Sequence, residues 1–334
     1  MKVLFIGGTG NISTAVSRLA IENQIDLYLL NRGNRHNFKI KAKHLQADIT
    51  QLNQVNAVLN SHSWDAVVNW IGFTEDDVKK DFQLFARKTK QYIFISSASV
   101  YQKPLLHPIV TESTPLTNPY WQYSRNKIIC ENYLIKQYRE NGFPVIIVRP
   151  SLTYETVIPV AIGGWTNYNI VDRIKKEKKI IVHGDGSSLW TITHARDFAR
   201  GFLGLLGNQQ AIGHAFHITS DEILTWDQIY DILADAVGKQ ANKIHIPSDF
   251  ICRVDPALTG SLQGDKSVSA IFDNSKIKRF VPSFQAIIPF CQGIKKTILW
   301  FEERSERMHI CQKTELMINN IITAYEKAFK DNSV

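Results

Sequence analysis

The chain has 334 residues, of which 44% are hydrophobic and 21% charged, and its formal net charge is +8 at pH 7. This composition is typical of a folded globular protein and excludes a low-complexity or disordered chain. No apolar run approaches the roughly 18 residues of a membrane-spanning helix, and the first expected strand begins at Lys2, so we expect a cytoplasmic protein without membrane contact.

Charge and cysteine content argue against two further kinds of site. The lysines and arginines are dispersed along the chain, which argues against a nucleic-acid partner although the net charge is positive. Cys130, Cys252, Cys291 and Cys311 form no C-x-x-C pair and have no histidine at a zinc-binding spacing. We therefore expect reduced thiols and no metal site.

The first half of the chain alternates short apolar runs with segments of helical spacing. The apolar runs predict buried strands at residues 2–6, 26–30, 65–69, 91–96 and 144–149. Helices are predicted between them at residues 12–23, 51–60, 75–89 and 121–140. This order predicts an α/β fold with a doubly wound parallel sheet of the Rossmann type and right-handed crossovers.

Prolines and glycines interrupt the chain after Arg149, and residues 151–300 are expected to form mainly a smaller substrate-binding lobe over the carboxyl edge of the sheet. Within this range, residues 195–218 are expected to return to the sheet as a helix and a strand. Thr225 and Gln228 predict a capping box that opens a helix at 226–237, before a strand at 243–246. One amphipathic helix is predicted over residues 303–328, within a C-terminal segment 303–334.

The segment GGTGNIS lies between the first strand and the first helix. Gly7 and Gly10 would let a pyrophosphate approach the backbone, and the helix start at Asn11 and Ile12 would add N–H donors and positive potential. Ser13 stands where a third glycine would let the helix pack closely on its strand. A tight turn without a ligand is the alternative. The cofactor interpretation makes residues 1–150 an NAD(P)-binding domain.

The end of the second strand lacks the carboxylate that sites for NAD usually present to the ribose. Asn31 and Arg32 stand there, with Arg35 nearby, and an arginine pairs well with a 2′-phosphate, so NADP is slightly favoured over NAD. Solvent-facing loop arginines are the alternative. Asp48 and Ile49 are expected to meet the adenine, although Asp48 could equally cap the following helix.

Three residues carry most of the functional interpretation. Ser97 follows a buried strand, and Tyr123 and Lys127 lie at i and i+4 on one face of a predicted helix. A lysine ammonium beside a phenol stabilises the phenolate and lowers its pKa from about 10 toward neutrality. We expect Tyr123 to act as acid and base, Ser97 to orient the substrate oxygen, and Lys127 to tune the phenol and hold the nicotinamide ribose. An unremarkable surface pair is the alternative.

Gly7-x-x-Gly10, Ser97, the Tyr123/Lys127 pair, and the segment GDGSSLWTITHARDFA at 184–199 together resemble the extended short-chain dehydrogenase/reductase superfamily, also called the NAD-dependent epimerase/dehydratase family. The resemblance covers roughly residues 1–250. It implies bound NAD(P), a Ser-Tyr-Lys triad, reversible hydride transfer at a hydroxyl-bearing carbon, and a homodimer through paired helices. The remaining residues expected at the cofactor are Asn69 and Pro150.

The chain departs from the sugar-nucleotide enzymes of this family at three places. Trp190 stands where an arginine contacts the substrate diphosphate, and Leu152 stands where an asparagine is usual. The pattern therefore does not support diphosphate recognition. Ala98 and Ser99 follow Ser97 where dehydratases carry Asp-Glu, which disfavours a 4,6-dehydratase.

The second lobe is expected to hold a small, sugar-like substrate. Tyr154, Trp165 and Trp190 would provide an aromatic wall, although core packing explains these residues equally well, and Ser97 and Ser99 are also expected to bind the substrate. The sequence thus predicts an NAD(P)-dependent oxidoreductase or epimerase. The segments GGTGNIS and RPSLTY are also similar to a subgroup that includes chloroplast stem-loop RNA-binding proteins, so a non-catalytic RNA-binding protein is the alternative.

Overall fold

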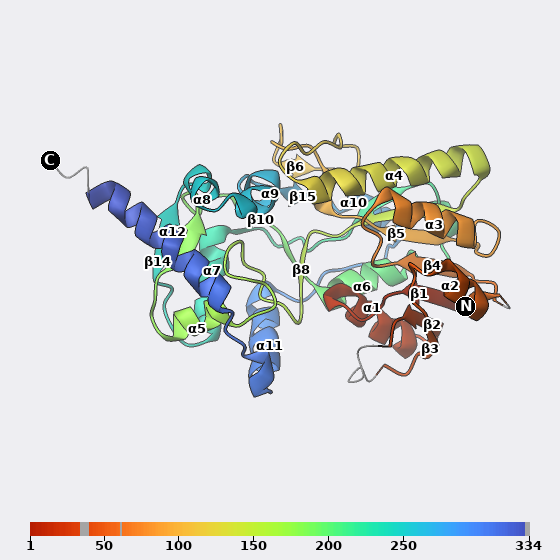
Figure 1. Cartoon of the computed structure of the whole chain (residues 1–334), viewed down its shortest axis with the longest axis horizontal. Helices are drawn as coiled ribbons and strands as arrows, with labels where there is room; N and C mark the ends of the chain where they lie inside the picture. The colour runs from red at the N-terminus through yellow and green to blue at the C-terminus, as the bar shows by residue number, and fades with distance from the viewer. Residues whose placement is uncertain (34–39, 61, 331–334) are drawn as a thin grey trace.

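The computed structural model describes residues 1–33, 40–60 and 62–330. Two lobes lie side by side along the long axis of the molecule, and the last helix projects from the end that is farther from the N-terminus (Figure 1). The predicted Arg35 lies outside the described residues. Within the part of the chain that is described, no helix is long and apolar enough to cross a membrane.

A seven-stranded parallel sheet forms the centre of the first lobe, in the order β12-β7-β5-β4-β1-β2-β3. Its strands are β1 (Lys2–Ile6), β2 (Asp26–Asn31), β3 (Lys43–Gln46), β4 (Ala66–Asn69), β5 (Tyr92–Ile95), β7 (Val145–Arg149) and β12 (Ala215–His217). The predicted doubly wound parallel sheet is confirmed. Strand β3 was missed in the sequence analysis. It lies at the edge of the sheet and carries polar, mostly exposed residues in place of an apolar run.

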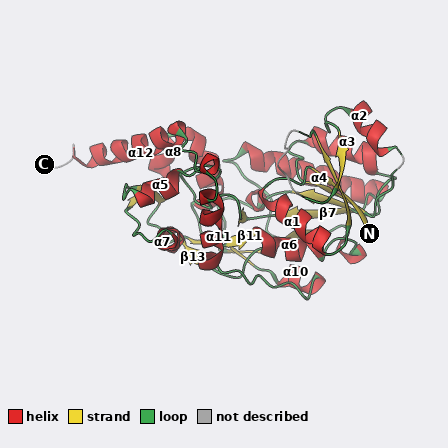
Figure 2. Ribbon diagram, turned by 90° about the horizontal axis from the view of Figure 1, so that it is seen from below, coloured by secondary structure: helices red, strands yellow, loops and turns green. Residues whose placement is uncertain are grey.

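Helices cover both faces of the sheet (Figure 2). One face packs on α1 (Asn11–Glu22) and α6 (Ala195–Leu203), and the other packs on α2 (Leu52–Leu59), α3 (Glu75–Phe85) and α4 (Gln122–Asn141). Successive residues of β1 alternate between the two cores, since Val3 and Phe5 join the first while Leu4 and Ile6 join the second. Because these strands are buried on both faces of the sheet, their sequences are continuous apolar runs without alternating polar residues.

The second lobe surrounds its own core and contains four two-stranded sheets. The strands here, and those that link it to the first lobe, are β6 (Ile109–Val110), β8 (Leu152–Tyr154), β9 (Ile180–His183), β10 (Leu189–Trp190), β11 (Ile192–His194), β13 (Leu224–Thr225), β14 (Lys243–Ile246) and β15 (Ile271–Phe272). The helices here are α5 (Asn169–Lys175), α7 (Trp226–Ala236), α8 (Ser248–Val254), α9 (Thr259–Ser261), α11 (Phe290–Glu302) and α12 (Gln312–Lys330), whereas α10 (Ser275–Phe280) packs against the core of the first lobe. The predicted capping box of α7 is confirmed, because the backbone N–H of Gln228 donates to Thr225 Oγ1 at 3.1 Å.

The single helix expected over residues 303–328 is wrong at its start. Helix α11 ends at Glu302, and α12 begins only at Gln312. Between them the Arg307 guanidinium donates to the carbonyl oxygen of Trp300 at 2.6 Å, which caps the last turn of α11. The backbone N–H of Cys311 donates to the Asn169 side chain at 2.9 Å, so tertiary contacts replace helical hydrogen bonds here.

Candidate active site

A large cavity lies at the carboxyl ends of the parallel strands, where the sheet meets the second lobe. This main cavity has a volume of about 1140 Å³. Its wall includes the turn after β1, the ends of β2 and β5, helix α4, and the segments 150–153 and 265–266. Ligands of open parallel sheets bind at this edge, so the cavity is the candidate active site.

The glycine turn after β1 forms one end of the main cavity. Gly7 and Gly8 have φ of 95° and 92°, and a β-carbon on Gly8 would lie 2.7 Å from Leu29 Cδ2. Any side chain here would therefore be both strained and crowded. Gly7 and Gly10 both line the cavity, as expected for a turn that lets a ligand approach the backbone.

Ser13 has a role in this turn that the sequence did not indicate. Its Oγ accepts a hydrogen bond from the backbone N–H of Gly10 at 2.8 Å, which forms half of a capping box at the start of α1. The serine thus does more than replace a packing glycine. Because it takes the N–H of Gly10, the free donors for an anion are those of the first helical turn, where Asn11 and Ile12 line the cavity.

The side chain of Asn11 forms hydrogen bonds with two threonines after β7. Its Nδ2 donates to the carbonyl oxygen of Thr153 at 2.8 Å, and its Oδ1 accepts from the backbone N–H of Thr156 at 3.0 Å. Asn11 was expected to bind the cofactor. Its amide also joins the glycine turn to the second lobe, and one N–H of Nδ2 and the backbone N–H are left for a ligand.

The far end of the main cavity is formed by residues after β2 and β3. Asn31, Arg32, Asp48 and Ile49 line it, and Arg32 is exposed. Asp48 Oδ1 accepts from the backbone N–H and the hydroxyl of Thr50, and these hydrogen bonds hold the pKa of Asp48 below its ordinary value. Asp48 therefore shapes the turn before α2 and also faces the cavity.

Asn69 does not line the main cavity, contrary to expectation. It is buried, with its Nδ2 donating to Asp81 Oδ2 and its Oδ1 accepting from the backbone N–H of Ile71 at 2.7 Å. Burial raises the pKa of Asp81 to about 6, although hydrogen bonds from Tyr92 and Asn69 oppose the rise. Asn69 supports the loop after β4, whereas Pro150 does reach the cavity wall.

Ser97, Tyr123 and Lys127 meet at the middle of the main cavity. Burial raises the pKa of Tyr123, and a hydrogen bond with Ser97 opposes this rise. Lys127 is only 2% exposed, its Nζ donates to the carbonyl oxygens of Gly72 at 2.6 Å and Ile95 at 2.8 Å, and burial lowers its pKa to about 8. Its Nζ lies 5.8 Å from the centre of the Tyr123 ring.

A chain of hydroxyl groups supports Ser97 from behind. Ser124 Oγ donates to Ser99 Oγ at 2.7 Å, and the hydroxyls of Ser99 and Ser97 are 2.9 Å apart. The backbone N–H of Ser99 also donates to Ser97 Oγ at 3.2 Å. Ser99, which was expected to bind substrate, lines the cavity and at the same time orients Ser97.

Two of the three aromatic residues expected around the substrate lie in the core. Tyr154 is fully buried against His194 and Phe290, and Trp190 is buried against Trp226, so neither lines the main cavity. For Tyr154 and Trp190 the structure therefore agrees with core packing, which the sequence analysis gave as the alternative to substrate binding. Trp165 does line the cavity.

Among the cavity residues that the sequence did not indicate as site residues, three lie near Trp165. Trp121, Asp265 and Lys266 join Trp165 at the substrate end. Asp265 and Lys266 follow Gly264 in an irregular helical turn, and no periodic pattern marks them. Only the adjacent pair of opposite charges could have drawn attention to them, and such pairs are common on solvated surfaces.

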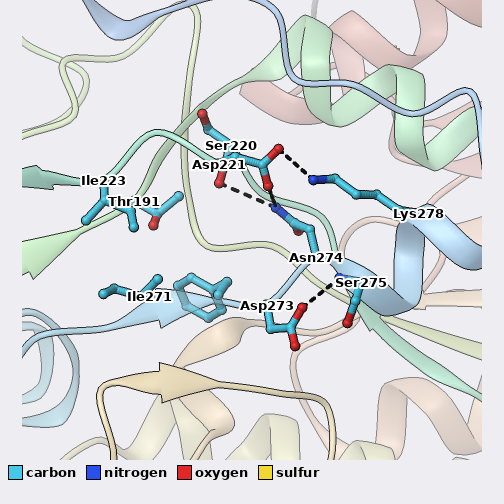
Figure 3. Close-up of a pocket in the computed structure, with 10 residues that line it drawn as sticks. Thr191, Ser220, Asp221, Ile223, Ile271, Asp273, Asn274, Ser275 and Lys278 are labelled. Carbon is cyan, nitrogen blue, oxygen red and sulfur yellow. Dashed lines mark hydrogen bonds and ion pairs between the residues drawn. The ribbon is translucent and has the colours of Figure 1, made fainter.

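A second cavity of about 310 Å³ lies beside α10 (Figure 3). Asn274 Nδ2 donates to Asp221 Oδ1 at 2.9 Å, and Lys278 Nζ is 2.8 Å from Asp221 Oδ2. Asp273 Oδ1 accepts from the backbone N–H of Ser275 at 2.8 Å. The charged groups in its wall thus have partners within the protein. These contacts are explained by the packing of α10 and do not require a ligand.

The chain is similar to curated proteins with different activities. It is 27% identical over 256 residues to the chloroplast stem-loop binding protein of 41 kDa b from Arabidopsis thaliana, which covers 71% of this chain and 63% of that protein. It is 21% identical over 294 residues to 2′-dehydrokanamycin reductase from Streptomyces kanamyceticus, which covers 85% and 80% of the two chains. The chain thus spans less than two thirds of the length of the plant relative.

Solved structures of similar fold include sugar-nucleotide enzymes. The dTDP-glucose 4,6-dehydratase of Bacillus anthracis in complex with NAD matches with a TM-score of 0.71 at 17% identity, over 92% of this chain and 98% of that chain. The UDP-glucose 4-epimerase of Thermus thermophilus in complex with NAD matches with a TM-score of 0.71 at 16% identity, over 90% and 99%. These likenesses show the shared fold.

The model of the NAD dependent epimerase/dehydratase family matches residues 3–219. This range contains the seven-stranded sheet, the glycine turn and the Ser97, Tyr123 and Lys127 cluster. The match agrees with the family resemblance that the sequence motifs indicated. The chain therefore belongs to the NAD-dependent epimerase/dehydratase family.

Proposed function

We propose that the protein is an NAD(P)-dependent oxidoreductase or epimerase that acts at a hydroxyl- or keto-bearing carbon of a sugar-like substrate. The observation that carries the proposal is the cluster of Ser97 and Tyr123 above the buried Lys127, in one cavity with the glycine turn. The similar proteins include 2′-dehydrokanamycin reductase and UDP-glucose 4-epimerase. Their names refer to sugar-containing compounds, which supports a sugar-like substrate.

The main cavity fits a dinucleotide followed by a small substrate. Gly7 and Gly8 line the cavity with bare backbone, and the start of α1 offers N–H donors for the phosphates. A volume of about 1140 Å³ exceeds the roughly 300–1000 Å³ of a pocket for a single ligand. When bound, the nicotinamide would supply or accept the hydride.

The residues in the middle of the main cavity would handle the proton and the substrate oxygen. The Tyr123 hydroxyl would give its proton to a substrate carbonyl oxygen during reduction, or take one from a hydroxyl during oxidation. Ser97 would hold the same oxygen by a hydrogen bond, since Ser99 and Ser124 fix its own position.

Lys127 would stabilise the phenolate of Tyr123. Its ammonium has three N–H donors, and two of these donate to the carbonyl oxygens of Gly72 and Ile95. One donor is left for a ribose hydroxyl or for the phenol. A positive charge close to the phenol oxygen would favour the ionised form of Tyr123.

The choice between NAD and NADP stays open in the proposal. The similar solved structures in complex with NAD give no support to the expected preference for NADP. The cofactor that copurifies can be identified by mass spectrometry after denaturation. If Arg32 binds a 2′-phosphate, Arg32→Ala will weaken NADPH binding and leave NADH binding unchanged; equal effects on both would remove Arg32 from this role.

We also include a cytoplasmic homodimer in the proposal, with α3 and α4 as its contact surface. Ile129 on α4 is 45% exposed and Tyr138 is 37% exposed, which supports an apolar contact there. Sedimentation of the wild-type chain and of Ile129→Glu would test it. A monomeric wild-type chain would contradict this part of the proposal.

The experiment that tests the function compares wild-type enzyme with Tyr123→Phe on a panel of keto and hydroxy sugars. Loss of the phenol proton should lower turnover by about 10²–10⁴-fold, and the thermal unfolding midpoint should change little. Turnover retained in Tyr123→Phe would contradict the proposed role of Tyr123.

A second candidate function is RNA binding, because a curated relative is a stem-loop binding protein and the net charge is +8. Such binding should weaken steeply with salt and survive Tyr123→Phe. Both activities can be measured on one preparation. Tight stem-loop binding with no turnover on the whole panel would favour this candidate over the enzyme.

A further inference from the structure

Asp265 and Lys266 line the substrate end of the main cavity, and a second buried lysine, Lys103, contacts Asp265. Lys266 Nζ is 3.0 Å from Asp265 Oδ2, while Lys103 Nζ is 3.8 Å from Asp265 Oδ1 and donates to the Asp265 carbonyl oxygen at 3.1 Å. Both lysines are 4% exposed. Two ammonium groups share one carboxylate, so this lysine pair and Asp265 carry one excess positive charge where water is largely excluded.

The Lys266 ammonium has donors to spare. Among the described residues, the carboxylate of Asp265 is the one hydrogen-bond acceptor at its Nζ, although an ammonium carries three donors. The rings of Trp121 and Trp165 are its other neighbours, with their centres 6.0 Å and 5.5 Å from Nζ. Buried charges are costly unless they are fully hydrogen-bonded, so an acceptor from a ligand would satisfy this group.

The backbone that carries Lys266 is held firmly. His183 Nε2 donates to the carbonyl oxygen of Lys266 at 2.9 Å, and Asn118 Nδ2 donates to the carbonyl oxygen of Gly264 at 2.7 Å. Both supporting side chains are buried. The ammonium is therefore presented from a preorganised segment, as a group that recognises a ligand should be.

The Lys266 subsite adjoins the residues proposed to move the proton. The ring of Trp121 lies 5.0 Å from the ring of Tyr123, and the charge of Asp265 helps to raise the pKa of Tyr123. A ligand that touches Lys266 would consequently lie next to Ser97 and Tyr123. Trp190, which is buried in the core, adds no group for a diphosphate.

We propose that Lys266 determines substrate specificity by binding a single anionic group of the substrate, a carboxylate or a phosphate monoester, between Trp121 and Trp165. The inference rests on the proposed function, because it assumes that the main cavity holds a substrate beside Tyr123. One excess positive charge matches one such group better than a nucleoside diphosphate.

The test measures ligand binding by calorimetry on the full chain, without any need for turnover. The probes are glucose, glucuronate, glucose 6-phosphate and UDP-glucose, which supply a neutral sugar, a carboxylate, a phosphate monoester and a diphosphate. The variants are Lys266→Met, Lys266→Arg and, as a surface control, Lys278→Met, whose lysine lies at the second cavity. Thermal unfolding checks that each variant folds.

At least one of the two singly substituted anionic sugars should bind the wild-type chain more tightly than glucose. Lys266→Met should weaken that binding by about 10- to 100-fold, because a charge-assisted hydrogen bond is lost, and Lys266→Arg should keep most of it. Lys278→Met should have no effect. The comparison of glucuronate with glucose 6-phosphate identifies which anionic group is recognised.

Three results would overturn the assignment of Lys266: no preference for either anionic sugar over glucose, unchanged binding in Lys266→Met, or tighter binding of UDP-glucose that does not depend on Lys266. Failure of the proposed function would look different. In that case Tyr123→Phe would not change turnover, while anionic binding would still depend on Lys266.

Discussion

The two walls of the main cavity are built in different ways. The wall from the first lobe consists of strand ends and a glycine turn, and its backbone groups are positioned by a regular parallel sheet. The wall from the second lobe consists of short segments, which are held by buried side chains such as His183 and Asn118. Regular backbone positions the first wall, whereas tertiary side-chain contacts position the second.

The largest expected effect concerns Lys127, whose ammonium is proposed to serve catalysis from the first wall. Lys127→Met leaves the carbonyl oxygens of Gly72 and Ile95 without this donor and removes the charge near Tyr123. Turnover should fall by about 10²–10⁴-fold, and stability should fall as well. Steady-state kinetics and thermal unfolding measure both changes.

Lys136→Met is the control, because Lys136 lies exposed on the same helix and forms an ion pair with Glu140 on the helix surface. It should leave turnover unchanged. Equal losses in both variants would show that α4 tolerates no such change, and normal turnover in Lys127→Met would exclude Lys127 from catalysis.

The two lobes should respond to pH in opposite directions. Burial raises the pKa of Asp81 in the first lobe to about 6, so its contribution to stability is present below pH 4 and is lost as the pH rises through about 6. Burial lowers the pKa of His183 in the second lobe to about 4, so its contribution is present above pH 6.5 and is lost as the pH falls toward 4. Each group accounts for up to about 3 kcal/mol.

Urea unfolding of wild-type, Asp81→Asn and His183→Gln proteins between pH 4 and 7 checks these signs. Relative to wild type, Asp81→Asn should gain stability as the pH rises, and His183→Gln should gain stability as the pH falls. Parallel pH profiles for the three proteins would mean that neither side chain is ionised differently in the folded state.

Gly8 should tolerate a methyl group less well than Gly142, which also has a positive φ but lies in open space. Gly8→Ala combines a φ of 92° with a contact of 2.7 Å to Leu29 and should cost about 1–3 kcal/mol. Gly142 has a φ of 65° with no atom within 4 Å of the new carbon, so Gly142→Ala should cost about 1 kcal/mol. If urea unfolding gives equal costs, the close packing of the glycine turn contributes nothing.

The smallest expected effect compares one capping box in each lobe. Ser13→Ala and Thr225→Ala each remove a hydroxyl at a helix start and should each cost about 1 kcal/mol. Only Ser13→Ala should also weaken NAD(P) binding, by about threefold, because the cap fixes the turn at Gly10. Calorimetry with the copurified cofactor measures the binding of both variants. If Thr225→Ala weakened cofactor binding as much as Ser13→Ala, the cap at Ser13 would have no specific role in positioning the turn at Gly10.

Most strands of the first lobe could be predicted because each of them is a largely apolar run. Five runs, from residues 2–6 to 144–149, correspond to β1, β2, β4, β5 and β7. Strand β3 lacked such a run, and α11 was missed among the irregular segments of the second half. The false start at residue 303 arose because amphipathic spacing cannot reveal that Arg307 closes the preceding helix.

The site could be predicted where short motifs determine it. Ser97, Tyr123 and Lys127 do line one cavity with the glycine turn, although their catalytic role remains a proposal. Lys266 could not be found in this way, because its environment combines residues from segments more than a hundred positions apart. Trp190 was expected to contact the substrate, and it stands where related enzymes carry a substrate-binding arginine. The structure instead buries it in the core.

The contacts of Asn11 limit how the protein could exchange ligands in the main cavity. Three hydrogen bonds join this residue to Thr153 and Thr156, so the lobes cannot separate along that seam without breaking them. A rotation that widens the main cavity would have its hinge there. Cofactor and product would then enter and leave the main cavity at the edge farthest from Asn11. The rate of turnover would depend on how readily the cavity opens at that edge.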